Sequence, residues 1–262
     1  MKRLLSSLSY QLLRDGAMVR ITLLLAAGLA VFGFVLGLSA EEEACAGRLI
    51  VDSPPILWMF QSMLMAILAA VICTADFRDK VIYQELMAGH SRAEIFFSRA
   101  IPATLLTAAV ATLLSFMPVL SNCLIFGWGD VLEPAGALLR IALFFFPFLR
   151  MAAFFVLVAF LCKKSAVVIV SGYIIMTLGL FLENVSPDHP GFLLGFYNLQ
   201  DLCDFSTWSI YNLDQEGGIL TFTAYDSSIS AGMIAGTVLV SLLVSAVYLM
   251  AGYGFFRRDD MN

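Results

Sequence analysis

The chain has 262 residues, of which 60% are hydrophobic and only 13% are charged, and its mean hydropathy is +0.89. This composition leaves too little polar surface to cover a water-soluble globule of that length. The net charge of −5, without a basic stripe carrying interleaved aromatic residues, gives no sign of nucleic-acid binding. We therefore expect a protein that lies in a lipid bilayer.

Residues 1–20 are expected to form an amphipathic helix in the headgroup layer. Four leucines fall on one side of a helical wheel, and basic residues such as Arg3 and Arg14 lie opposite. The alternative is a frayed N-terminus that only supplies positive charge. The sequence has no convincing cleavage site after this stretch, so we expect the segment to be retained.

Six strongly apolar stretches follow, and each is near or above the roughly 18 residues that cross the hydrocarbon core. They are continuously apolar instead of alternating, which is the helical pattern. The predicted fold class is therefore all-α, with a single transmembrane domain over residues 1–262 and six transmembrane helices. These helices are expected at residues 21–38, 56–74, 101–126, 137–162, 166–182 and 231–256.

The basic residues predict the orientation, because Lys and Arg are retained on cytoplasmic flanks. With both termini inside, 12 of the 15 basic residues fall on the cytoplasmic side, whereas the outer loops collect 13 of the 20 acidic residues. Arg48 is the basic residue that falls in an outer loop. A multi-pass membrane protein with both termini in the cytoplasm is the expected result.

The inner segment 75–100 is dense in charge and lies between two apolar stretches. Phe77, Val81, Leu86 and Met87 can share one face of a short helix along the membrane surface. The polar residues on its other faces are Arg78, Asp79, Lys80 and Glu85. The segment is either a surface on which a partner acts or a charged connector between two spans, and the residues alone leave both readings open.

The turn within this segment has a specific signature. Gly89 permits a left-handed helix end, and Ser91 is placed to cap a second helix that begins at Arg92. Glu94 occupies the third position of that helix, which predicts a capping box.

Arg150 lies in an otherwise apolar run, where a guanidinium costs at least ~2.5 kcal/mol unless it has a partner. It either faces a substrate path or makes an internal link, to carbonyls loosened by Pro147 or to a hydroxyl such as Thr107 or Thr177. Both readings remain open. Arg140 is nearer the outer boundary, and we expect it to reach lipid headgroups.

The outer segment 183–230 is more apolar than a solvated loop, so we expect short helices packed on the outer ends of the bundle. Cys45, Cys123 and Cys203 all fall outside, which leaves one disulfide open, although free thiols are favoured. No metal-ligand spacing, phosphate loop or nucleophile elbow occurs in the sequence. We therefore expect neither an active site nor a metal in this chain.

The pattern of Gly89, Ser91-Arg92 and Arg99 resembles that of permease subunits of ATP-binding-cassette (ABC) transporters of the type-2 superfamily. In them an amphipathic segment between the second and third spans ends in Pro or Gly, then Ser-Arg and a later basic residue. The long outer segment before the last span and the short charged tail are similar as well. The sequence departs from the family at Lys80-Val81, where many relatives carry Gly-Thr, and at Arg99, where Lys is common.

This resemblance implies an exporter of an amphiphilic substrate, such as an antimicrobial peptide, a drug or a lipid, in a bacterial plasma membrane. A separate cytoplasmic ATPase would bind ATP and Mg²⁺ and dock on the inner segment, and the chain itself would bind no cofactor. A second copy or a related permease would complete the pathway. The resemblance assigns ATPase coupling to the inner segment, where Arg78, Glu85 and Arg92 are the expected polar contacts. The competing hypothesis is a channel or scaffold that works without ATP.

Overall fold

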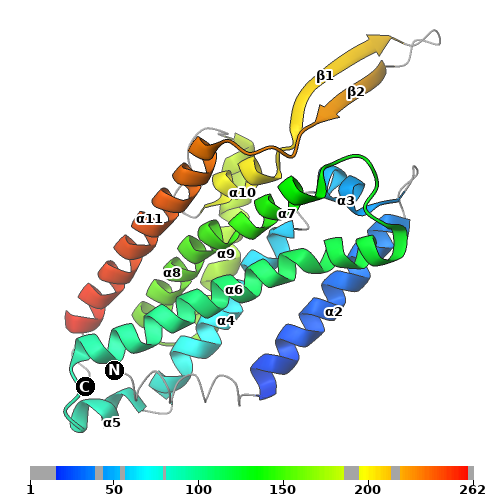
Figure 1. The fold of residues 1–262 in the computed structure, drawn as a ribbon. Coiled ribbons are helices and arrows are strands. Elements are labelled where there is room, and N and C mark those ends of the chain that lie inside the picture. Colours follow the sequence, from blue (N-terminus) through cyan, green and yellow to red (C-terminus); the bar gives the residue numbers. More distant parts are fainter. Residues whose placement is uncertain are drawn as a thin grey trace.

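The computed structural model describes residues 16–38, 44–53, 57–78, 81–185, 195–213 and 219–258. The greater part of the predicted interfacial helix, together with Asp79 and Lys80, lies outside these residues. Within them the chain is mostly helical, as expected (Figure 1). The helices are α2 (Gly16–Leu38), α3 (Ala46–Asp52), α4 (Met59–Arg78), α5 (Val81–Met87), α6 (Arg92–Phe126), α7 (Pro134–Leu143), α8 (Phe145–Cys162), α9 (Ser165–Val185), α10 (Phe196–Cys203) and α11 (Ala231–Arg258).

Three helical runs of the described chain are long and apolar enough to cross a membrane. They are Arg92–Phe126, Pro134–Cys162 and Ala231–Arg258, with 35, 29 and 28 residues. Shorter apolar helices cover Thr22–Leu38, Met59–Thr74 and Ser165–Ile174, at three more of the predicted spans. A membrane protein is supported by these helices, whereas the count of six spans stays a prediction.

The helix boundaries differ from the predicted ones in three places. α2 begins at Gly16, so residues 16–20 belong to the first long helix and not to a separate interfacial one. The short helix expected at Arg92 continues without interruption through the predicted third span and forms α6. The fourth predicted span is divided between α7 and α8 at Phe144. Pro147 explains this break, because a proline has no N–H to donate to the carbonyl of Leu143.

α8 is the centre of the bundle, packed between α11, α6, α4 and α9, while α2 lies along α6. The close approach of α2 to α6 depends on two glycines. A Cβ atom on Gly33 would lie 2.7 Å from the Cα of Pro118, and one on Gly37 would lie 2.5 Å from Oδ1 of Asn122. Small residues of this kind allow helix backbones to approach in a membrane.

The outer segment contains α10 and, unexpectedly, two strands, β1 (Ser206–Leu213) and β2 (Ile219–Tyr225). They pair antiparallel, with Ile210 opposite Phe222, and form a hairpin that projects from one end of the bundle (Figure 1). The expectation of short helices is therefore correct for α10 and wrong for residues 206–225. We call this end of the bundle the hairpin end, and the end that carries α5 the elbow end.

Candidate functional site

The elbow is the turn from α5 to α6, and its local geometry agrees with the sequence prediction. Gly89 has a φ of +89°. The N–H of His90 donates to the carbonyl of Glu85 over 3.2 Å, which closes a Schellman-type helix end around the glycine. A residue with a Cβ would be strained at this φ, so the turn requires glycine at position 89.

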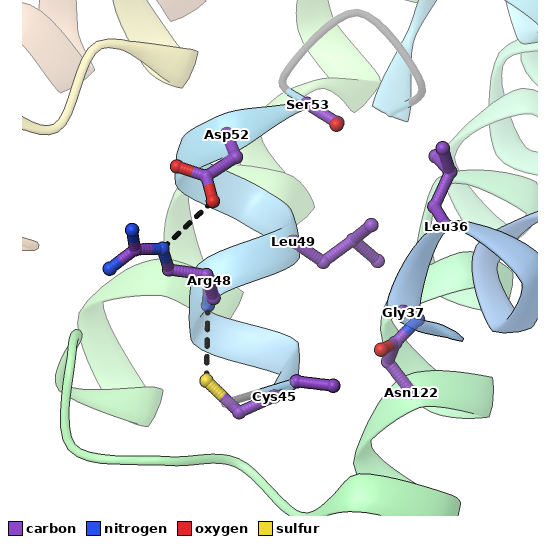
Figure 2. A pocket seen from close by; sticks show the side chains of 9 residues that line it. Leu36, Gly37, Cys45, Arg48, Leu49, Asp52, Ser53 and Asn122 are labelled. Carbon is purple, nitrogen blue, oxygen red and sulfur yellow. Dashed lines mark hydrogen bonds and ion pairs between the residues drawn. The ribbon is translucent and has the colours of Figure 1, made fainter. Parts of the chain in front are cut away.

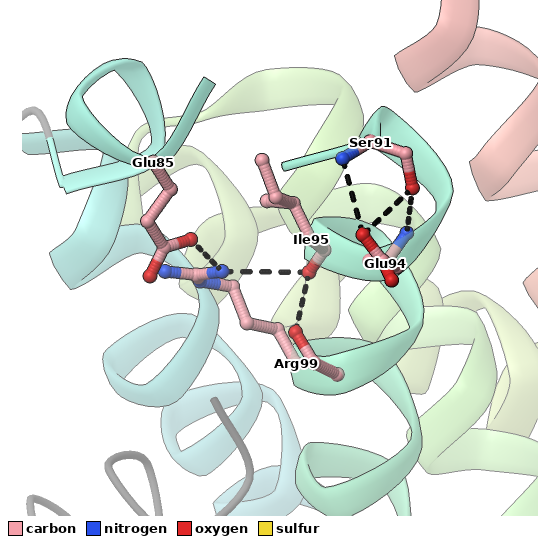
Figure 3. A network of polar contacts seen from close by, with 6 residues as sticks. Glu85, Ser91, Glu94, Ile95 and Arg99 are labelled. Carbon is pink, nitrogen blue, oxygen red and sulfur yellow. Dashed lines mark hydrogen bonds and ion pairs between the residues drawn. The ribbon is translucent and has the colours of Figure 1, made fainter. Parts of the chain in front are cut away.

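The capping box predicted at the start of α6 is also present (Figure 3). The N–H of Glu94 donates to Oγ of Ser91 over 3.2 Å, and the N–H of Ser91 donates to Oε2 of Glu94 over 3.2 Å. Two backbone donors that would lack partners at a helix start are thus satisfied, a contribution of about 1 kcal/mol. The elbow therefore holds its shape by local bonds.

An ion pair ties the short helix to the long one (Figure 3). Nη1 of Arg99 lies 2.7 Å from Oε2 of Glu85, and the same nitrogen donates to the carbonyl of Ile95 over 3.4 Å. The side chains of Arg99 and Glu85 are only 5% and 19% exposed. Because solvent screens a buried pair poorly, this contact is a brace between α5 and α6. The resemblance assigned both residues to partner coupling, and the structure shows them in contact with each other.

Beneath the elbow lies a cluster of aromatic rings from four helices. The ring of Phe96 is 4.6 Å from that of Phe160 and 5.8 Å from that of Phe256, and Phe77 packs edge-on against Phe160. Ile82 of α5 is fully buried in the hydrophobic core to which these rings belong. α5 packs on α4 and α6, and the start of α6 contributes Phe96 to the aromatic cluster, so the elbow is connected to that cluster through α6.

The exposed part of the elbow is small. Met87 is 90% exposed, and the turn from Ala88 to Ser91 is exposed as well. Met87 was expected to share an apolar face with Val81 and Leu86 along the membrane surface, and that stays a prediction; the residue of α5 that is buried in the bundle is Ile82. An exposed methionine at the tip of a rigid turn is suited to insertion into a partner's groove.

The other inner residues are placed as follows. Arg92 donates from Nη1 to the carbonyl of Arg257 over 2.8 Å, which connects the start of α6 to the end of α11. Arg78 is the last residue of α4. The elbow brings together Glu85, Gly89, Ser91, Arg92 and Arg99 from the predicted set.

Arg150 is fully buried in the middle of the bundle. Its Nη2 donates to Oδ1 of Asn198 in α10 over 2.5 Å and to Oγ of Ser241 in α11 over 3.2 Å. Of the two hydroxyls expected from the sequence, that of Thr177 donates to the carbonyl of Tyr173, and Oγ1 of Thr107 has no hydrogen-bond partner among the described residues. Arg150 is therefore linked to α10 and α11 within the chain, and its place on a substrate path stays a prediction.

Arg140 was expected at lipid headgroups, and instead it holds the base of the hairpin. Its guanidinium donates to backbone carbonyls on both sides of the two strands and stacks on the ring of Phe205 at 4.6 Å. The four carbonyls belong to Asp204, Asp226, Ser227 and Ser228, at distances of 2.5 to 3.3 Å. The sequence could not predict this contact, because its acceptors are backbone carbonyls, which every residue has, and no side-chain pattern marks them.

The groups around this hairpin base titrate away from their usual ranges. Hydrogen bonds from Ser228 to the carboxylate lower the pKa of Asp226. Burial raises the pKa of the Cys203 thiol and, with help from the charge of Asp204, raises the pKa of Asp201. The thiol of Cys203 is therefore a poor nucleophile.

The described residues bring together no group of three His, Cys, Asp or Glu side chains that could hold a metal ion. The five cysteines are present there as free thiols. Comparison of the sequence with protein-family models and with curated proteins finds no match.

Proposed function

We propose that this chain is the membrane subunit of an ATP-driven exporter, in which the elbow transmits the work of a separate cytoplasmic ATPase. The observation that carries the proposal is the construction of the elbow. The ion pair of Glu85 and Arg99 and the capping box of Ser91 and Glu94 hold the turn in place, and the side chain of Met87 next to the turn is exposed. A connector that only joined two spans would need none of this rigidity.

In this proposal the ATPase supplies the free energy of ATP hydrolysis, and the residues of this chain convert a push into a change of helix packing. A push on Met87 reaches α6 through the ion pair of Arg99 and reaches the aromatic cluster through Ile82. Arg92 carries the same displacement to the end of α11. The helices that line a path between two permease halves would then move together.

The cargo we propose is an amphiphile, such as an antimicrobial peptide, a drug or a lipid-like molecule, which passes between this chain and a second copy or a related permease. The elbow end would lie in the cytoplasm of a bacterial cell and the hairpin end outside, as the distribution of basic residues predicts.

The test changes the exposed tip and leaves the core intact. Met87→Asp introduces a charge at a side chain that is 90% exposed, so folding and membrane insertion are expected to be unchanged. Binding of the proposed ATPase partner, measured by co-purification, and substrate-stimulated ATP hydrolysis are expected to fall at least about ten-fold, because hot-spot side chains carry ~1.4 kcal/mol or more. Arg92→Glu is expected to act in the same direction.

A matched control is Lys164→Glu, which changes an exposed residue in the turn between α8 and α9, outside the turn from α5 to α6. It is expected to leave both readouts unchanged. Normal ATPase recruitment and coupling in Met87→Asp, or persistent absence of any ATPase partner, would contradict the proposal and favour a protein that works without ATP.

A further inference from the structure

A cavity of about 220 Å³ lies near the hairpin end, between α2, α3 and α6 (Figure 2). Its apolar wall comes from Leu36 of α2 and Leu49 of α3. Cys45, which caps α3, lies on the same wall and accepts a bond from the N–H of Arg48. All the residues that line this space belong to one chain.

Asn122 of α6 gives the cavity one deep polar group. The side chain is fully buried, and its Nδ2 donates to the carbonyl of Gly33 over 2.5 Å. Because a carbonyl can only accept, this bond fixes the orientation of the amide and directs Oδ1 toward the cavity, as Figure 2 shows. Among the described residues Oδ1 has no hydrogen-bond partner. A buried acceptor left in that state costs about 1–3 kcal/mol.

The two charged side chains that line the cavity, Arg48 and Asp52, form an ion pair at its edge. Nε of Arg48 lies 2.8 Å from Oδ2 of Asp52, and the two side chains are 35% and 50% exposed. Apart from Asp52, none of the described residues that line the cavity carries a carboxylate. A cation placed at Oδ1 would therefore be desolvated without a counter-charge, which is costly, whereas a neutral donor would not be.

The size of the cavity limits the ligand further. Its 220 Å³ equals the volume of roughly seven water molecules in the liquid, at ~30 Å³ each. A short alkyl chain of about that many heavy atoms would pack against Leu36 and Leu49 and gain from their burial. A water molecule could donate to Oδ1 of Asn122, but it would gain no free energy from contact with Leu36 and Leu49.

We propose that this cavity binds a short aliphatic chain that ends in a hydroxyl, with the hydroxyl donating to Oδ1 of Asn122 and the chain lying between Leu36 and Leu49. The hydroxyl belongs either to a free alcohol or to the exposed end of a lipid. This site does not depend on the proposed function, because it needs neither the elbow nor an ATPase.

The experiment uses the full chain, alone, in lipid nanodiscs. The probe is a hexanol that carries a photoreactive diazirine on its chain, and the labelled residues are identified by mass spectrometry. We expect label on Leu36, Cys45 or Leu49. Unlabelled 1-hexanol is expected to compete about five-fold better than 1-fluorohexane, which has the same shape and no donor, because one hydrogen bond supplies ~1 kcal/mol.

Three variants keep the result interpretable. Leu49→Trp fills the cavity and leaves the bond between Asn122 and Gly33 in place, so it is expected to abolish the label. Leu124→Trp makes the same change on the exposed face of α6, where the side chain is 77% exposed, and is expected to leave the label unchanged. Asn122→Leu is expected to make the two competitors equal.

The proposal is overturned if no cavity residue is labelled, which would mean that only water enters. It is also overturned if Leu49→Trp keeps the label or if 1-fluorohexane competes as well as 1-hexanol in the unchanged chain. Repeating the labelling in nanodiscs doped with monoacylglycerol distinguishes the sources: competition by this lipid assigns the site to lipid, and its failure assigns it to a free alcohol. None of these outcomes bears on coupling to an ATPase.

Discussion

The brace between Glu85 and Arg99 gives the sharpest quantitative prediction. Glu85→Gln keeps the size of the side chain and removes its charge, which leaves the guanidinium of Arg99 in a site where it is 5% exposed. Breaking a fully buried pair in this way costs about 3–5 kcal/mol. Since Glu85 is itself 19% exposed, water can partly replace it, so we expect a value near ~3 kcal/mol.

The assay is hydrogen exchange at the amides of α5 in nanodiscs, because opening of this short helix should become roughly a hundred-fold more frequent. A double-mutant cycle with Arg99→Met isolates the pair. The double variant should be more stable than the sum of the single effects by at least ~1.5 kcal/mol, since it removes the guanidinium whose ion pair with Glu85 the single variant has already broken. Glu94→Gln, an exposed change in the capping box, serves as the control and should alter the exchange of α5 little.

Effects that add within about 0.5 kcal/mol would show that Glu85 and Arg99 do not act as a unit. The elbow would then owe its rigidity to the buried Ile82 and the turn alone, and the reasoning about the brace would be refuted.

Four further outcomes are expected. Arg140→Leu should leave the bundle folded but release the hairpin base, seen as faster proteolysis between residues 204 and 228, since four carbonyl contacts are lost. Arg150→Met, of similar length, should lower expression, because it leaves the acceptors on Asn198 and Ser241 without their donor inside the bundle; preserved folding with lost transport would instead support the substrate-path reading. Gly33→Val should destabilise the chain by about 2–3 kcal/mol in detergent unfolding, since its Cβ would overlap the backbone of Pro118. Ser228→Ala should raise the pKa of Asp226 toward its ordinary value, as measured by NMR titration of the carboxyl carbon. Because the pKa of this group is lower in the folded than in the unfolded state, it adds stability that is present at neutral pH and is lost as the pH falls through the folded-state pKa. The variant should lose that added stability.

The features of the elbow could be predicted because their signals are local. Gly89 and the Ser91-Glu94 box act over a few neighbouring residues, so the turn geometry follows from the sequence itself. Apolar run length likewise placed the long helices, although the break before Pro147 was overlooked despite its clear local signal.

The long-range polar contacts could not be predicted. Arg150 bonds to Asn198 and Ser241, which lie 48 and 91 positions away, and several other polar residues were equally eligible. Arg140 binds carbonyls, which every residue possesses, so no side-chain pattern points to them. The hairpin was missed because aromatic and β-branched residues in an outer segment suit a short interfacial helix as well as a strand.

The length of α6 has a mechanical consequence. Asn122 follows Arg92 by 30 positions in one uninterrupted helix, so the two residues are about 45 Å apart at 1.5 Å per residue. A rotation of roughly 5° about its inner end would swing the far end by about 4 Å. Such a lever arm turns a small rotation at the elbow into a displacement of about 4 Å beside the cavity at the opposite end.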